Sequence, residues 1–292
     1  MEQFAQQIIA GVAAGGVYAC IALAVVMIYQ AAHHVNFAQG EMAMFSTFVA
    51  WQLLQWGVSY WTAFALTLAL SFVGGVLIER VLFRPLKNAP PLSHVVAFIA
   101  LYAILNSLAG AIWDFNVKTM PTPFGAGPLL ENGLVSLHQA GVIVVALAAP
   151  AALSAFFRYT RLGLAMRAAA DNPVSARLAG VRVGWMTALG WGVAASIGAV
   201  AGMLIAPVVF LEPNMMLGVL LYGFAGAVAG GLSSASGAVV GGLLVGVVEN
   251  LAGAYVPVAG SELKLPIALA VIVAVLMFKP AGLMGRAVVK RV

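Results

Sequence analysis

Two short polar runs interrupt an otherwise apolar sequence, and they are the places where chemistry could reside. The first is Asn36-Phe37-Ala38-Gln39-Gly40-Glu41, and the second is Glu249-Asn250. A carboxylate within a membrane is costly unless it is paired, protonated or hydrated, so such a residue faces a cavity or another helix. Two interpretations stay open for these side chains, a translocation path or a structural contact between helices. The candidates are Asn36, Gln39, Glu41, Glu249 and Asn250.

The first run stands at the start of a predicted helix. We expect Asn36 to be its N-cap, and Glu41 then lies in the positive end of the helix dipole, where a carboxylate is stabilised. That role is the structural alternative to lining a path. His33 and His34 precede the run, and because adjacent residues point to different faces we expect interfacial positions rather than a shared metal.

Residues 158–182 form a third segment of interest, with five arginines and residues typical of the start and end of a helix. Asn172 can cap a helix, Pro173 suits the first helical position, and Gly180 can adopt the left-handed conformation that ends one. A helix of two turns is unstable alone in water. The pattern therefore indicates docking against a partner protein, and an ordinary basic loop that only sets membrane topology is the alternative.

The elements that hold these residues must lie in a membrane. The chain has 292 residues, of which 63% are hydrophobic and 8% charged, against about 25% charged in soluble domains. We expect an all-α integral membrane protein, a polytopic helical bundle of about eight to nine transmembrane segments, in one permease domain over 1–292. Segments 37–56 and 216–232 are expected to be broken or re-entrant, because each is short and flanked by polar or glycine-rich sequence. The segments are roughly 8–29, 37–56, 60–82, 92–113, 139–157, 185–206, 216–232, 237–256 and 264–279.

The placement of basic residues predicts the orientation of these segments. Clusters around Arg80, within 158–182 and around Lys279 mark cytoplasmic loops, because such loops are enriched in Lys and Arg. The loops at 114–138, 207–215 and 257–263 and the N-terminus then lie outside. The net charge of +5 follows from this topology and gives no argument for binding nucleic acid.

Several kinds of chemistry find no support in the sequence. Cys20 is the only cysteine, so a disulfide or a cysteine-based metal site within the chain is excluded. The chain has no G-x-x-x-x-G-K-[ST], G-x-S-x-G or H-E-x-x-H motif. We predict no catalytic and no metal-binding residues. The glycines from Gly223 to Gly246 instead predict close approach of helix backbones in lipid.

Three ordered blocks resemble the permeases of branched-chain amino-acid ABC importers, specifically the shorter of that family's two permease types. The first is Asn36 to Glu41, with Gln39 where His is usual. The second runs from Arg167 to Val181, and the third comprises 226–242, Glu249 and 278–285. The resemblance implies that 158–182 is a cytoplasmic coupling loop. Its expected contacts with an ATPase are made by Arg167, Asp171, Asn172, Pro173, Arg177 and Gly180.

The resemblance also implies partners and a location. These are a second homologous permease, two cytoplasmic ATP-binding subunits that hold ATP and Mg, and an extracytoplasmic substrate-binding protein, in a bacterial inner membrane. The substrate is expected to be a branched-chain or related amino acid, and this chain is expected to hold no cofactor. The alternatives are an ABC permease for urea, short amides or sugars, and a stand-alone secondary transporter or channel.

Overall fold

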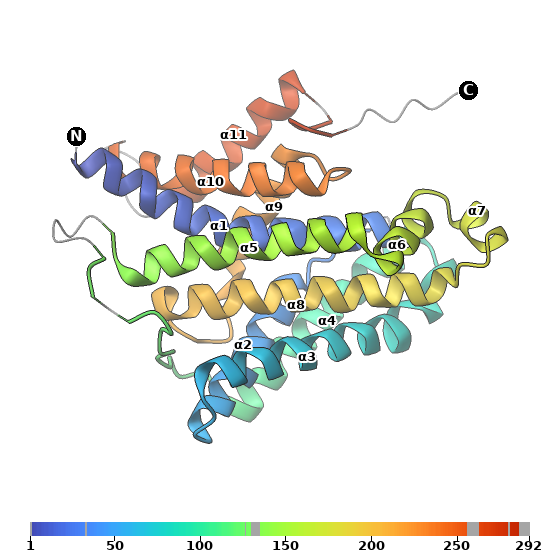
Figure 1. Cartoon of the computed structure of the whole chain (residues 1–292), viewed down its shortest axis with the longest axis horizontal. Helices are drawn as coiled ribbons and strands as arrows, with labels where there is room; N and C mark the ends of the chain where they lie inside the picture. Colours follow the sequence, from blue (N-terminus) through green and yellow to red (C-terminus); the bar gives the residue numbers. More distant parts are fainter. Residues whose placement is uncertain are drawn as a thin grey trace. The chain divides into compact units, whose positions relative to one another are not determined.

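The computed structural model describes residues 2–32, 34–125, 127–129, 135–255, 263–279 and 281–285, and this part of the chain is helical with two isolated β-bridges. Figure 1 shows the helices in chain order. They are α1 (Glu2–Ala32), α2 (Gln39–Gln55), α3 (Tyr60–Ile78), the π-helical turn η1 (Glu79–Phe83), the 3-10 turn η2 (Pro85–Asn88), α4 (Pro91–Trp113), α5 (Leu137–Tyr159), α6 (Arg161–Asp171), α7 (Pro173–Leu178), α8 (Val183–Val209), α9 (Met216–Gly230), α10 (Ala235–Tyr255) and α11 (Lys264–Phe278).

Six of the described helices are long and apolar enough to cross a membrane. They are α1, α3 continued by η1, α4, α5, α8 and α10. Three shorter helices, α2, α9 and α11, have 17, 15 and 15 residues. Together these nine correspond in order to the nine predicted segments, so the expected all-α membrane protein is confirmed. The two segments expected to be broken or re-entrant, α2 and α9, are among the three short ones.

The chain forms two compact units, each assembled from separate stretches of sequence. The first unit contains 1–26, 124–147 and 218–292, and the second contains 27–123 and 148–217. Helices α1, α5 and α9 each contribute to both units, because a unit boundary falls within each of them.

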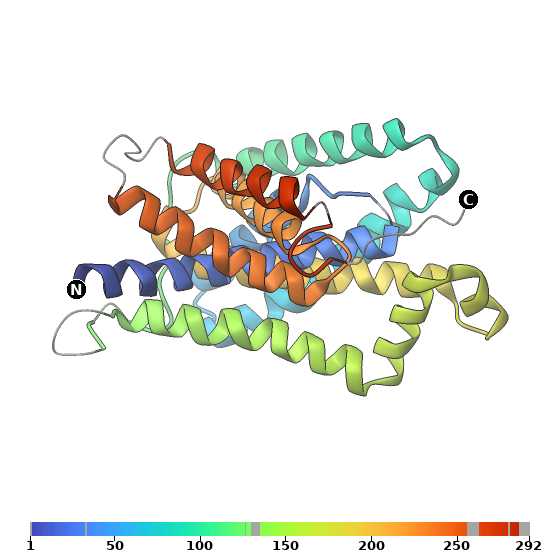
Figure 2. The ribbon, with the colours of Figure 1, turned by 90° about the horizontal axis from the view of Figure 1, so that it is seen from above.

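In the first unit, glycines bring α1 and α10 into backbone contact. A Cβ on Gly15 would lie 2.8 Å from the Leu243 carbonyl oxygen, and one on Gly11 would lie 2.8 Å from the Cα of Val247. Figures 1 and 2 show the two helices side by side. In lipid, where apolar burial gives little driving force, such close packing is what holds helices together. The glycine-rich block predicted this contact type without identifying α1 as the partner.

In the second unit, α8 packs closely along α3 (Figure 1). Gly75 has no room for a side chain, since a Cβ there would lie 2.6 Å from the Trp191 carbonyl oxygen. The Ser196 hydroxyl donates to the Leu68 carbonyl at 3.0 Å. Trp191 is buried, with the Phe98 ring stacked on it and the Phe83 ring tilted against it, so α8, η1 and α4 share an aromatic core.

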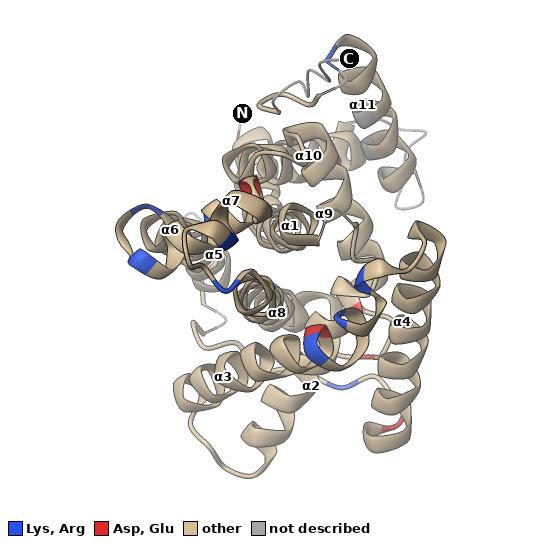
Figure 3. Cartoon of the chain, turned by 90° about the vertical axis from the view of Figure 1, so that its right-hand side faces the viewer, with Lys and Arg blue, Asp and Glu red and all other residues tan. Residues whose placement is uncertain are grey.

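The second unit also brings its two basic segments to the same end of α8. The Arg80 guanidinium lies 3.5 Å from the centre of the Trp185 ring, and a Cβ on Gly184 would lie 3.6 Å from Arg84. The backbones of Lys118 and Leu211 form an isolated antiparallel β-bridge just beyond the opposite end of α8. Because α8 has 27 residues, these ends are about 40 Å apart. Figure 3 shows Lys and Arg confined to a few short parts of a ribbon that is otherwise mostly uncharged.

Candidate functional site

Helix α2 begins inside the second unit. The Gln39 side-chain amide donates to the Ala194 carbonyl at 3.1 Å, and Ala194 lies 11 residues beyond the start of α8, about 16 Å along its axis. The first three residues of α2 are all buried. A helix N-terminus at such depth is typical of the discontinuous helices of transporters, whose partly positive ends face a polar site.

Asn36 does not cap α2, so that prediction is wrong. The N-cap residue is Ala38, which makes no side-chain bond. The Asn36 side chain instead accepts a 2.9 Å hydrogen bond from the Ala38 N–H and donates to the Gln39 side chain at 3.2 Å. This local turn starts the helix two residues later than a cap at Asn36 would, because asparagine satisfies a nearby N–H equally well from a turn. Both side chains are buried and serve to hold the turn.

Glu41 lies in the first turn of α2 and belongs to a polar cluster that reaches the loop after α8. Its side chain is 1% exposed and accepts a 3.4 Å hydrogen bond from the Asn106 amide of α4. The same amide donates to the Pro213 carbonyl at 3.1 Å and to the Asn214 side chain at 3.2 Å. Asn106 therefore links the carboxylate to the loop after α8.

Glu249 occupies a second polar cluster, within the first unit. It is buried in α10, and its carboxylate accepts a 2.7 Å hydrogen bond from the Tyr18 hydroxyl of α1. The Tyr222 ring of α9 stacks on Tyr18 with ring centres 5.0 Å apart. The neighbouring Asn250 side chain donates to the Gly246 carbonyl of its own helix, at 3.0 Å. A polar contact between helices is thus present at Glu249.

The predicted coupling segment folds as two short helices. Thr160 caps α6 by accepting from the Gly163 N–H at 2.9 Å, and Asn172 caps α7 by accepting from the Ser175 N–H at 3.0 Å. Pro173 opens α7, and Gly180 follows it with φ of +83°. The predicted short helix, its cap at Asn172, its first residue Pro173 and its stop at Gly180 are confirmed. Helix α6 was not predicted.

Helices α6 and α7 share a small core that leaves an apolar surface outside. Ala169, Ala176 and Val183 bury one another. On the outer face of α7, Val174 is 66% exposed and Leu178 is 86% exposed. They are four residues apart and hence neighbours on one helix face. The predicted contact residues Arg167, Asp171, Asn172, Arg177 and Gly180 are exposed, and Pro173 is partly buried.

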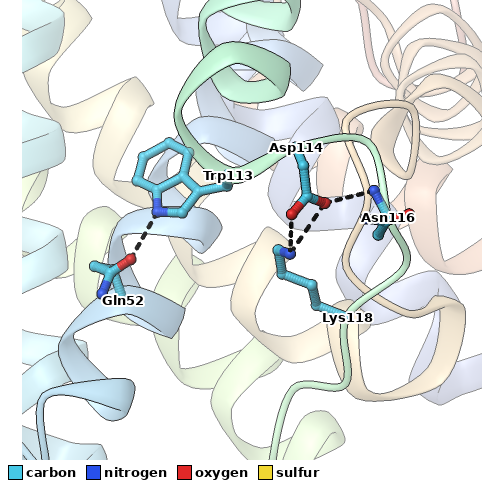
Figure 4. Close-up of polar contacts among 5 residues, drawn as sticks. All are labelled: Gln52, Trp113, Asp114, Asn116 and Lys118. Atoms are coloured by element: carbon cyan, nitrogen blue, oxygen red, sulfur yellow. Dashed lines mark hydrogen bonds and ion pairs between the residues drawn. The ribbon is translucent and has the colours of Figure 1, made fainter.

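The opposite end of the second unit has the features of a membrane interface. The Trp113 indole donates to the Gln52 side chain at 2.9 Å, and Lys118 pairs with Asp114 at 3.2 Å (Figure 4). The Asn116 N–H donates to Asp114 and, with Lys118, lowers the pKa of that carboxyl below its usual range. Tryptophan enrichment at interfaces agrees with this assignment.

Three contact residues were missed because each looked like an ordinary member of its helix. Asn106 is an amide in the middle of the long uncharged stretch of α4, and that position was the one available signal. Tyr18 and Tyr222 carried no signal, since their role depends on a residue more than 20 positions away. Of the histidine pair, His33 lies outside the described residues, and His34 stacks on His94 with ring centres 4.1 Å apart.

Comparison with known proteins gives one consistent answer. Residues 7–278 match the family model for the branched-chain amino acid transport system permease component. The high-affinity branched-chain amino acid transport system permease protein LivH of Salmonella typhimurium is 31% identical over 99% of this chain and 98% of its own. BraD of Pseudomonas aeruginosa, described as the same kind of permease, is 31% identical with the same coverage. The solved structure of PsaBC from Streptococcus pneumoniae in complex with Fab is similar over 95% of this chain and 91% of that one, with 12% identity and a TM-score of 0.48.

Proposed function

The chain belongs to the family of branched-chain amino acid transport permeases, and on that premise we propose that it forms half of the translocation path of an ATP-driven amino-acid importer. It is a multi-pass protein of the bacterial inner membrane. The path opens alternately to the two sides of the membrane. The chain itself moves substrate, and ATP is hydrolysed by separate subunits.

The substrate class follows from the relatives. LivH and BraD are named as permeases of high-affinity branched-chain amino acid transport systems, and near-complete coverage of both chains supports the same class here. We propose leucine, isoleucine, valine or a related amino acid as substrate. An extracytoplasmic binding protein selects it before it reaches the permease.

One observation carries the coupling part of the proposal: two large apolar side chains project from a capped helix outside the spans. Val174 and Leu178 lie on one face of α7 and are largely exposed. A helix of six residues gains little stability by itself, and here a buried core with α6 and α8 fixes it. An apolar patch on a rigid support is typical of a protein interface. We assign it to a cytoplasmic ATPase.

The charged residues around this patch suit a complementary partner. Arg167, Asp171 and Arg177 are exposed, and exposed ion pairs contribute under about 1 kcal/mol each. They orient the contact, while the apolar pair supplies most of the affinity. The partners that complete the importer are a second homologous permease, two ATPases that bind ATP and Mg, and the binding protein.

Within the membrane we assign the path to the buried polar clusters. Glu41, with Asn106 beside it, presents a carboxylate at the start of a helix that begins at depth. Glu249 presents a second carboxylate, held by Tyr18. Carboxylates at such depth are expensive and are retained mainly where substrate or ions pass. Asn36, Gln39 and Asn250 support these positions through the hydrogen bonds described above.

The coupling assignment is tested by disrupting the exposed face of α7 while leaving its core intact. In the reconstituted importer, we expect Leu178→Ser with Val174→Ser to reduce ATPase co-purification and substrate-stimulated ATP hydrolysis at least about tenfold, as for loss of an interface anchor. Arg177→Ala, on the same helix, is the matched control and changes either by less than about fivefold. Wild-type co-purification of the double variant rules out this surface as the ATPase contact.

A further inference from the structure

Two neighbouring cavities on one face of α8 in the second unit, together called the groove below, are not used by the coupling and path assignments. Its outer part is a cavity of about 340 Å³ lined by Arg182, Trp185, Met186 and Leu189. Its inner part is a cavity of about 310 Å³ to which α8 contributes Val193, Ser196, Ile197 and Val200. The spacing of these eight positions, at three and four residues, places them all within about 120° of the helix circumference.

The walls of the inner cavity are apolar. Leu68 and Phe72 of α3 form one side, and the other side comes from the last turns of α5. The α5 residues are Ala149, Ala152, Leu153 and Phe156. The Ser196 hydroxyl is already used, because it donates to the Leu68 and Gly192 carbonyls. The inner cavity therefore offers only apolar surface to an occupant.

The outer cavity is cationic. Arg182 lines it and is exposed, and the Arg80 guanidinium stacks at 3.5 Å on the ring of Trp185, another lining residue. Arg84 lies beside Gly184. The nearby carboxylate is Glu79, 3.9 Å from Arg80. Neither Arg84 nor Arg182 forms an ion pair with any residue that the structure describes, so positive charge remains available for an anion.

We propose that this groove binds an anionic diacyl phospholipid, with its phosphate at Arg182 beside Trp185 and an acyl chain that runs along α8 and ends in the apolar cavity. The inner cavity begins at Val193, about 16 Å along the axis from Arg182, and the hydrocarbon of one leaflet is about 15 Å deep, so the cavity receives the end of the chain. An arginine and a tryptophan at the headgroup level with apolar walls beneath suit a charged lipid.

Lipid binding to the purified full-length chain tests the headgroup site. Native mass spectrometry with dioleoyl phosphatidylglycerol and dioleoyl phosphatidylcholine is expected to show preferential retention of the anionic lipid. Arg182→Ala should weaken phosphatidylglycerol binding about fivefold, since one basic residue near the membrane surface contributes about 1 kcal/mol. Arg161→Ala, an exposed arginine that does not line the groove, should leave binding unchanged. Equal affinity for the two lipids, or an unchanged affinity in Arg182→Ala, would overturn the assignment.

The acyl-chain part is tested independently at two adjacent alanines. Ala151 and Ala152 are both exposed on α5, but only Ala152 lines the inner cavity. Ala152→Phe should fill it and lower the affinity for phosphatidylglycerol several-fold, whereas Ala151→Phe should not. Competition by millimolar inorganic phosphate as strong as that by the lipid would contradict a lipid site and indicate an anion site instead. A failure to displace bound lipid with phosphate supports the diacyl ligand.

Discussion

The Tyr18 hydroxyl donates a 2.7 Å hydrogen bond to the Glu249 carboxylate and so joins α1 to α10 through a buried acid. The helices around this bond approach closely because Gly15 and Gly246 leave no side chain between their backbones. A buried carboxylate that accepts from a hydroxyl of another helix is fixed in position. That arrangement motivates the first prediction.

Replacing Glu249 separates a transport role from a structural one. We expect Glu249→Leu to reduce amino-acid uptake about tenfold or more while membrane abundance changes little, because the apolar side chain suits the bilayer. Glu249→Gln keeps an acceptor for Tyr18 and is the matched control for the charge. Uptake and immunodetected abundance are measured on the same cells. Normal uptake in the leucine variant would show that Glu249 has only a structural role.

Glu41 allows the same comparison in the second unit. Its loss leaves the Asn106 amide with two other acceptors, at Pro213 and Asn214. We therefore expect Glu41→Leu to fold normally and to lose uptake, with Glu41→Gln intermediate because the amide still accepts from Asn106. The measurement is uptake per folded molecule, with folding assayed by size-exclusion chromatography. A variant that aggregates while the residual monomer transports normally would contradict a path role.

The positions of the helices could be predicted from the sequence, whereas the contacts between helices mostly could not. Helix positions could be read from uncharged stretches, because a span needs about 20 apolar residues, and α7 could be read from Asn172, Pro173 and Gly180. The pairing of Tyr18 with Glu249 could not, since it joins residues 231 positions apart and no local rule specifies it. The misplaced cap at Asn36 has a local cause, because asparagine serves turns and caps by the same hydrogen bond.

Replacing glycine by alanine should change the thermal stability differently at two helical positions, Gly74 and Gly15. Alanine is favoured over glycine in a helix by about 0.8–1 kcal/mol, so Gly74→Ala, where a Cβ meets open space, should not destabilise. At Gly15 the Cβ would lie 2.8 Å from backbone oxygen of α10, and overpacking costs about 1–3 kcal/mol. Thermal unfolding in detergent should show Gly15→Ala melting below wild type. Equal melting temperatures for both variants would refute the tight contact.

The orientation of the second unit can be measured by cysteine labelling. In a Cys20→Ala background, cysteines at Arg84 and Arg161 should be protected from an impermeant reagent in intact cells, and a cysteine at Lys118 should react. The reason is the enrichment of basic residues on the cytoplasmic side. The further predicted markers Glu131, Glu262 and Lys290 lie outside the described residues. Equal reactivity at Arg161 and Lys118 would contradict the topology.

Uptake of labelled leucine into proteoliposomes tests the central claim most directly. The vesicles hold this chain with its second permease and ATPases, and the binding protein is added outside. We predict uptake that requires enclosed ATP and the binding protein, and that is lost in the Leu178→Ser, Val174→Ser double variant. Vesicles with Arg177→Ala should lose less than about fivefold of the wild-type rate, since an exposed ion pair contributes under about 1 kcal/mol. Leucine uptake by this chain alone, driven by an ion gradient without ATP, would contradict the account.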